Sequence, residues 1–164
     1  MTPRPPAMLH ILVGKIAAGK STLSNTLSAE PNTVVIAEDL WLSELFGPEM
    51  NTISDYVRFS SRLRNVMAGH TARLLNAGTS VVLDFGANTL ESRAWLHDIL
   101  KDTRCDHILH FLDVPTEVCR ERVRARNAAG THPFSVTDAQ FDQITKHFLA
   151  PTEAEGFNIR HHTR

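Results

Sequence analysis

The sequence has few cysteines, no long hydrophobic run and no excess of charge of either sign. Its 164 residues include two cysteines, Cys105 and Cys119, whose spacing fits neither a disulfide framework nor a zinc site. No stretch approaches the roughly 20 apolar residues of a membrane span. The first six residues lack the apolar centre of a signal peptide. We therefore expect a cytoplasmic protein without a membrane segment.

The charge balance excludes another class. Lys and Arg total 17 and Asp and Glu total 18, a formal net charge of −1, which argues against a protein that coats nucleic acid with positive charge. A local basic site is still compatible with this balance. Because hydrophobic residues make up 42% of the chain and charged residues 21%, the composition is that of a globular protein. No internal repeat or linker-rich stretch occurs, so residues 1–164 are expected to form a single domain.

Short apolar runs alternate with amphipathic stretches along the chain, which predicts strands followed by helices. The predicted strands are 8–13, 33–37, 80–84, 107–112 and an edge strand at 157–161. The predicted helices are 21–29, 39–46, 52–76, 89–101, 115–126 and 137–149. This order indicates an α/β fold of three layers, α/β/α, with a mostly parallel sheet. In such folds ligands bind beyond the carboxyl ends of the strands.

The long predicted helix 52–76 is amphipathic. At 100° per residue, one face carries the apolar side chains that we expect to be buried: Ile53, Tyr56, Leu63, Met67 and Leu74. Arg58 and Arg62 fall on the opposite face. They are interpreted as a solvated face, with contact to an anionic acceptor as the alternative.

Residues 14–21 read Gly-Lys-Ile-Ala-Ala-Gly-Lys-Ser, the P-loop pattern GxxxxGKS. The motif follows a predicted strand and opens a predicted helix, as its chemistry requires. Glycines permit a tight turn, while backbone N–H groups and the helix N-terminus bind phosphate. Lys20 adds charge near the β- and γ-phosphates, and the Ser21 hydroxyl can ligate Mg²⁺. The sequence therefore predicts binding of ATP with Mg²⁺ through Gly14, Lys15, Ala17, Ala18, Gly19, Lys20, Ser21 and Thr22.

Carboxylates follow two of the predicted strands. Asp84 ends strand 80–84 and is expected to hold Mg²⁺ or its waters, with capping of the next turn as the alternative. Phosphoryl transfer to a hydroxyl needs a carboxylate that accepts the acceptor proton. Asp39, just after strand 33–37, is the candidate base, with capping of a helix as the alternative. Glu38 could share or replace that role.

Cationic side chains gather in predicted helix 115–126. Arg122 and Arg126 fall on the same side as Val118, Cys119 and Val123. A charge on an apolar face needs an anionic partner, and a triphosphate is such a partner. Pairing with a carboxylate, or snorkelling to solvent, is the alternative. With the loop that follows, this helix forms a predicted lid around residues 120–136.

These motifs together resemble the small P-loop kinases of the AAA_33, zeta-toxin, chloramphenicol phosphotransferase and polynucleotide kinase type. The resemblance spans roughly residues 8–150 and implies a five-stranded sheet in the order 2-3-1-4-5. It also implies that Asp39 is the acceptor base, and that Lys20 and the lid arginines Arg122 and Arg126 are catalytic. Arg93 matches a position where relatives often carry an arginine. Its role is either acceptor binding or structural.

The leading hypothesis is an ATP-dependent phosphotransferase that acts on a hydroxyl of a small molecule: a metabolite, a nucleotide or an antibiotic. The short chain leaves little room for an inserted acceptor domain, which favours a small acceptor. One alternative is an ATP-binding regulatory module without an acceptor. Another is a polynucleotide 5′-hydroxyl kinase, against which the near-neutral charge argues. The acceptor and the oligomeric state are left open.

Overall fold

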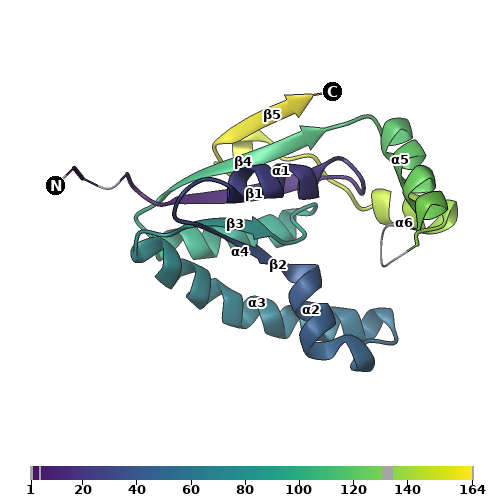
Figure 1. Cartoon of the computed structure of the whole chain (residues 1–164), viewed down its shortest axis with the longest axis horizontal. Coiled ribbons are helices and arrows are strands. Elements are labelled where there is room, and N and C mark those ends of the chain that lie inside the picture. Colours follow the sequence, from purple (N-terminus) through teal and green to yellow (C-terminus); the bar gives the residue numbers. More distant parts are fainter. Residues whose placement is uncertain (1, 4, 131–134, 164) are drawn as a thin grey trace.

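The computed structural model describes residues 2–3, 5–130 and 135–163. Its centre is a parallel five-stranded sheet in the order β2-β3-β1-β4-β5 (Figure 1). The strands are β1 (Met8–Gly14), β2 (Thr33–Ala37), β3 (Ser80–Asp84), β4 (Asp106–Asp113) and β5 (Ile159–Thr163). The α/β fold and the predicted strand order are therefore confirmed.

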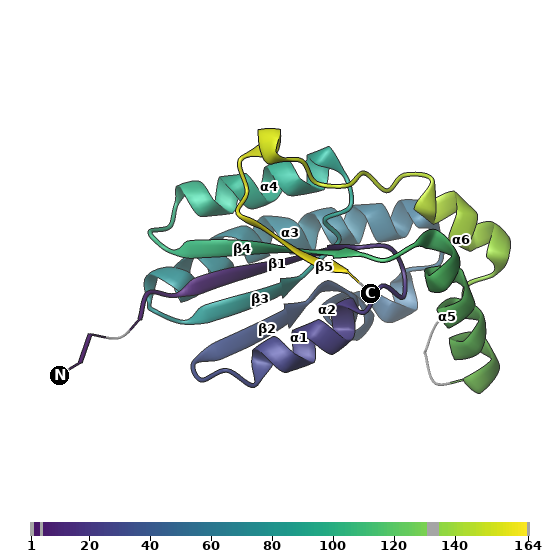
Figure 2. The same ribbon diagram turned by 90° about the horizontal axis from the view of Figure 1, so that it is seen from above.

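Helices connect successive strands and lie on both faces of the sheet. They are α1 (Lys20–Ser28), α2 (Glu38–Phe46), α3 (Ile53–Asn76), α4 (Leu90–Lys101), α5 (Thr116–Ala129) and α6 (Asp138–Thr145), with short 3₁₀ turns at Gly47–Glu49 and Glu153–Glu155. Figure 2 shows α3 and α4 on one face and α1 on the other, with α5 and α6 beyond the carboxyl ends of the strands. Among the described residues, no helix combines the length and apolarity that a bilayer crossing requires.

Alternation along the strands assigns each side chain to a face. Leu9, Ile11 and Leu109 are fully buried and pack with Leu63 and Met67 of α3 in the larger core cluster. Their sequence neighbours point to the opposite face because successive strand side chains alternate. That second face, on the side of α1, is where His10 and His110 lie.

The amphipathic pattern of α3 holds over its centre but fails at its start. Leu63 and Met67 are 4% exposed, as predicted, whereas Ile53 is 85% exposed and Tyr56 is 42% exposed. At about 1.5 Å per residue, a 24-residue helix is about twice as long as a five-residue strand, so the first turns of α3 extend past the sheet. The apolar side chains there line the space between α2 and α3 instead.

Candidate functional site

The P-loop connects β1 to α1, and its two glycines have different structural reasons. Gly19 has φ 109°, a left-handed conformation that favours glycine. At Gly14 the constraint is space, because a Cβ there would lie 3.1 Å from Cβ of Ala18 and 3.2 Å from Cβ of Leu112. Ala17 also takes a positive φ, 61°, at a cost of roughly 1–2 kcal/mol for a residue with a side chain. The loop is therefore held in a conformation that the chain would not adopt on its own.

Asn88 contributes to holding that conformation. The backbone N–H of Gly14 donates to Asn88 Oδ1 (3.2 Å), and Asn88 Nδ2 donates to the Gly14 carbonyl (2.9 Å). Sequence analysis missed this residue. A signal was available, because Asn88 lies four residues after Asp84, at the carboxyl end of the strand beside β1.

Lys20 lies across the mouth of the P-loop. Its Nζ donates to the carbonyls of Gly14 (2.6 Å) and Lys15 (2.8 Å). Burial lowers the pKa of Lys20 to about 8, opposed by the carboxylates of Asp84 and Asp39 and reinforced by the guanidinium of Arg126. These four charged side chains therefore act on one another electrostatically.

A single cavity of about 660 Å³, the central cavity, brings the predicted site residues together. Its lining includes six predicted catalytic and metal-binding residues, Lys20, Ser21, Asp39, Asp84, Arg122 and Arg126. Ala17, Gly19 and Thr22 also line it, whereas Gly14, Lys15 and Ala18 do not. The side chain of Lys15 points elsewhere, since its Nζ donates to the Val114 carbonyl (3.1 Å).

A second cavity of about 410 Å³, the outer cavity, lies on the other side of the P-loop. It shares Gly19, Thr22 and Arg122 with the central cavity. Its remaining lining is Ala18, Leu23, Thr26, Leu112, Val114 and His162. The two cavities therefore share part of their lining at the start of α1.

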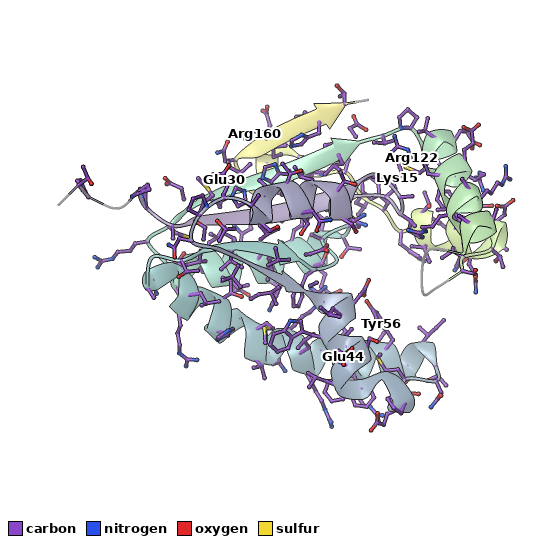
Figure 3. The ribbon with its side chains drawn as sticks, viewed as in Figure 1. Lys15, Glu30, Glu44, Tyr56, Arg122 and Arg160 are labelled. Atoms are coloured by element: carbon purple, nitrogen blue, oxygen red, sulfur yellow. The ribbon has the colours of Figure 1, made fainter. Side chains whose placement is uncertain are left out.

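The arginines of α5 divide into two pairs. Arg120 and Arg124 form ion pairs with Asp142 (2.7 Å) and Asp138 (2.6 Å) of α6. Arg122 instead turns to the P-loop, where its Nη1 donates to the carbonyl of Ala17 (3.2 Å), and Figure 3 shows it on α5 beside that loop.

Arg126 differs from these neighbours. Its Nε is buried and has no hydrogen-bond partner among the described residues. A buried donor without a partner costs free energy, and an anion in the central cavity is the partner that its charge requires. Part of the predicted lid, residues 131–134, lies outside the described residues. Beyond it, Asn127 Nδ2 donates to the Val136 carbonyl (2.7 Å) and ties the lid segment to α5.

Ser21 and Asp84 fit a magnesium site. Burial raises the pKa of Asp84, and the nearby carboxylates of Asp39 and Glu38 raise it further, while Lys20 lowers it. A divalent cation relieves this crowding of negative charge. Among the described residues no three His, Cys, Asp or Glu side chains are arranged to hold a metal. Mg²⁺ is bound in many proteins by one or two protein ligands together with water and phosphate oxygens.

Glu38 and Asp39 both line the central cavity, but Glu38 is buried whereas Asp39 is exposed. Glu38 is 3% exposed and accepts from Arg64 Nε (3.0 Å) and Ser60 Oγ (3.0 Å). Its carboxylate therefore joins α2 to α3, and this placement favours Asp39 as the candidate base. Arg64 was missed by sequence analysis. It follows Tyr56 and Ser60 at helical spacing, a polar stripe beside the apolar one.

Arg93, whose role the sequence left open between acceptor binding and structure, is structural. It is 1% exposed, pairs with Glu155 (2.6 Å) and donates to the carbonyls of Ala87 and Leu149 (both 2.9 Å). Arg58 is exposed and pairs with Asp55 within α3 (3.3 Å), which agrees with a solvated face.

Comparison with known proteins adds the family. The model of the AAA_33 family, described as an AAA domain, matches residues 9–151. The chain belongs to the AAA_33 family. The match to this AAA_33 domain spans the P-loop, both strand-end carboxylates, Arg122 and Arg126. No curated protein matches the sequence.

Solved structures similar to this AAA_33 domain include proteins described as kinases. A candidate kinase from Chloroflexus aurantiacus J-10-fl aligns over 98% of this chain and 86% of its own, with 17% identity and a TM-score of 0.74. Mycobacterium tuberculosis APS kinase CysC, in complex with AMPPNP and APS, aligns over 97% and 89%, with 19% identity and a TM-score of 0.62. A chain of the Pnkp1/Rnl/Hen1 RNA repair complex aligns over 89% and 45%, with 20% identity and a TM-score of 0.69. At these identities the likeness establishes the fold.

Proposed function

We propose that this protein is an ATP-dependent phosphotransferase that moves the γ-phosphoryl group of ATP to a hydroxyl of a small molecule. The observation that carries the proposal is the central cavity, which gathers Lys20, Ser21, Asp39, Asp84, Arg122 and Arg126. This set contains a cation at the P-loop, a metal-binding pair, a carboxylate and two further cations. Those are the groups that phosphoryl transfer needs.

The nucleotide takes the triphosphate side of the site. The backbone N–H groups of the P-loop and Lys20 bind the phosphates, and Arg126, whose Nε has no partner in the described part of the chain, donates to the same anion. Ser21 and Asp84 would hold Mg²⁺, which would supply charge neutralisation at the phosphate oxygens. The outer cavity, which joins the central cavity at Gly19, Thr22 and Arg122, accommodates the nucleobase.

The acceptor approaches from the opposite side. A cavity of about 450 Å³ between α2 and α3, the α2–α3 cavity, shares Asp39 and Tyr56 with the central cavity. Its other lining residues are Leu42, Ser43, Met50, Asn51, Thr52 and Ile53. This lining is largely apolar and contains no basic side chain, which favours an uncharged hydroxyl compound over a phosphorylated or sulfated one.

The chemical step follows from these positions. Asp39 accepts the proton of the acceptor hydroxyl as its oxygen forms a bond to the γ-phosphorus. The bond from that phosphorus to the β-bridging oxygen breaks, and ADP leaves. Lys20, Arg122 and Arg126 stabilise the charge on the transferring group.

A product scan tests the proposal. The protein is incubated with Mg²⁺-ATP and a cell metabolite extract, and mass spectrometry identifies species that gain one phosphoryl group. A phosphorylated hydroxyl compound that disappears with Asp39→Asn is the expected result. Binding of ATP with no such product contradicts the proposal and favours a regulatory module. A phosphorylated oligonucleotide end as the only product favours the polynucleotide kinase alternative.

The class of acceptor is tested separately. Matched pairs of alcohols, each neutral or carrying a phosphate elsewhere in the molecule, are compared as substrates. Preference for the neutral member is expected, because the α2–α3 cavity offers no cation to a second phosphate. Preference for the charged member contradicts this assignment of the cavity.

A further inference from the structure

The side chain of Asn88 extends the hydrogen bonding of the sheet at the start of the P-loop. β1 pairs with β4 as far as Gly14, which lies opposite Leu112, whereas its register with β3 ends at the pair Ile11 and Leu83. Past that pair, the Gly14 N–H donates to Asn88 Oδ1 (3.2 Å), and Asn88 Nδ2 donates to the Gly14 carbonyl (2.9 Å). The amide therefore offers Gly14 one acceptor and one donor, as a neighbouring strand would.

These contacts fix which end of the Asn88 amide faces which group. A backbone N–H can only donate and a carbonyl oxygen can only accept, so the amide oxygen must face the Gly14 N–H and the amide nitrogen the Gly14 carbonyl. A reversed amide would place donor against donor and acceptor against acceptor. Because the N–H and the carbonyl of Gly14 belong to successive peptide groups, Asn88 holds both of the peptide groups that flank its Cα.

Asn88 is itself held in place from three sides. Its backbone carbonyl accepts from the Leu149 N–H (2.9 Å). On one side, the carbonyl of Ala87 accepts from the buried guanidinium of Arg93 (2.9 Å). On the other side, Thr89 caps α4 through its hydroxyl. The side chain that reaches Gly14 therefore extends from a backbone whose position other contacts determine, which is the condition for positioning another group precisely.

The Gly14 carbonyl also accepts a hydrogen bond from Lys20. The distance from Lys20 Nζ to this oxygen is 2.6 Å, and Nζ also donates to the Lys15 carbonyl (2.8 Å). Two of the three N–H donors of the ammonium therefore go to carbonyls of the P-loop. Since Asn88 Nδ2 and Lys20 Nζ bond to the same oxygen, Asn88 fixes the carbonyl against which the ammonium of Lys20 is held.

We propose that Asn88 is a positioning residue of the phosphate site, which holds the Lys20 ammonium in place for the triphosphate through the carbonyl of Gly14. This inference rests on the proposed function only for the identity of the bound nucleotide. Without Asn88 the Gly14 carbonyl can turn, and the carboxylates of Asp84 and Asp39, whose charges act on Lys20, compete for the ammonium. An ammonium drawn toward a carboxylate gives less to the phosphates, so ATP binds more weakly.

A double-mutant cycle of ATP affinity tests the inference. Calorimetric titration with Mg²⁺-ATP gives the Kd of the wild type, Asn88→Ala, Lys20→Met and the double variant. We expect Asn88→Ala to weaken binding about tenfold, the effect of one misplaced hydrogen bond to a charged group. In the Lys20→Met background the same substitution should change the Kd less than about twofold, because the group on which Asn88 acts is gone.

A role of Asn88 in the backbone conformation alone predicts a different cycle. A loosened P-loop loses phosphate contacts whether or not Lys20 is present, so equal losses of affinity in the two backgrounds overturn the inference. Because Asn88 also lines the central cavity, it could instead touch the acceptor. An ATP affinity that Asn88→Ala leaves unchanged, with weaker binding of an acceptor or without it, overturns the inference too.

The matched control is Asn76→Ala at the end of α3. It removes a side-chain hydrogen bond to the Asp102 carbonyl (3.0 Å) and should leave ATP affinity unchanged. If Asn88→Ala does not fold, Asn88→Leu takes its place in the cycle, since leucine has a similar volume and makes neither bond to Gly14.

NMR of the free protein gives a second readout that needs no nucleotide. A scalar coupling across the hydrogen bond from Lys20 Nζ to the carbonyl carbon of Gly14 should be present in the wild type and lost in the Asn88 variant. A wild type without this coupling, or a variant that keeps it, overturns the inference.

Failure of the two proposals is distinguishable. A wild type that binds no ATP overturns both. A cycle in which the effect of Asn88→Ala depends on Lys20, without any phosphorylated acceptor, contradicts the phosphotransferase and supports the positioning role of Asn88. A phosphorylated acceptor together with equal losses of affinity in the two backgrounds does the reverse.

Discussion

Two arginines in this protein, Arg93 and Arg126, have opposite surroundings. Arg93 is buried, whereas Arg126 is only partly buried. Arg93 donates hydrogen bonds to Glu155 and to the carbonyls of Ala87 and Leu149, so its guanidinium is paired inside the fold. Arg126 has a buried Nε without a partner in the described part of the chain, and it lines the central cavity. The first arrangement stabilises the fold, and the second leaves capacity for an anion. Substitution separates the two roles, because one residue acts on stability and the other on transfer.

The largest effect is expected at Arg126. Arg126→Ala removes a cation from the transferring phosphoryl group and should slow transfer about 10³-fold or more. The melting temperature should change little, because the buried Nε of Arg126 has no hydrogen-bond partner among the described residues. Transfer rates and melting temperatures are compared with those of Arg124→Ala. Arg124 lies on α5 like Arg126, and its substitution removes only an exposed ion pair with Asp138 of α6. A large loss of stability in the Arg126 variant contradicts its assignment to the anion.

Asp39→Asn should reduce the transfer rate about 10²–10⁴-fold, because an amide cannot accept the acceptor proton. Nucleotide affinity should change little. The matched control is Glu44→Gln, an exposed carboxylate on the same helix. Single-turnover rates and calorimetric ATP binding check both expectations, and equal losses in binding and in rate would point to a role on the nucleotide side.

Arg93→Ala should destabilise the protein by about 3–5 kcal/mol, the cost of leaving a buried charge without its partner. Glu155, whose side chain is 13% exposed, then loses its ion-pair partner. The protein that remains folded should keep its affinity for ATP. Urea denaturation measures the effect against Arg73→Ala, an exposed arginine on α3. A stable Arg93→Ala variant with weak acceptor binding would return Arg93 to the acceptor site.

The smallest expected effect concerns pH. Because its pKa is lowered to about 8, Lys20 loses its proton at a lower pH in the folded protein than in the unfolded chain. The unfolded chain therefore binds more protons between about pH 8 and the ordinary lysine pKa near 10.4, and Lys20 makes stability rise with pH there. ATP affinity should fall about tenfold from about pH 7 to about pH 9, as the ammonium charge is lost. Calorimetric titration with ATP checks this in the wild type and in Lys20→Met. The ATP affinity of the variant should be low and should not depend on pH.

Local sequence patterns were sufficient to predict the order of strands and helices and the position of the P-loop. Apolar strand runs, GxxxxGKS and the carboxylates at strand ends all depend on neighbours in sequence, and the family resemblance supplied the strand order. The start of α3 was predicted wrongly at Ile53, because periodicity carries no information about where the sheet ends. Periodicity also carries no information about contacts between distant segments. Sequence analysis therefore missed Asn88, Arg64 and the hydrogen-bonded histidines His10, His110 and His162. Each joins residues far apart in the chain, such as His10 and His110.

Transfer of the γ-phosphoryl group of ATP to a hydroxyl is tested most directly by following that group in a reaction with an acceptor found by the product scan. ADP, inorganic phosphate and phosphorylated acceptor are quantified together over the same time course. We expect equal amounts of ADP and phosphorylated acceptor, with little inorganic phosphate, and loss of both products in Asp39→Asn. Formation of ADP matched by inorganic phosphate, unaffected by Asp39→Asn, would contradict it and identify a nucleotide hydrolase.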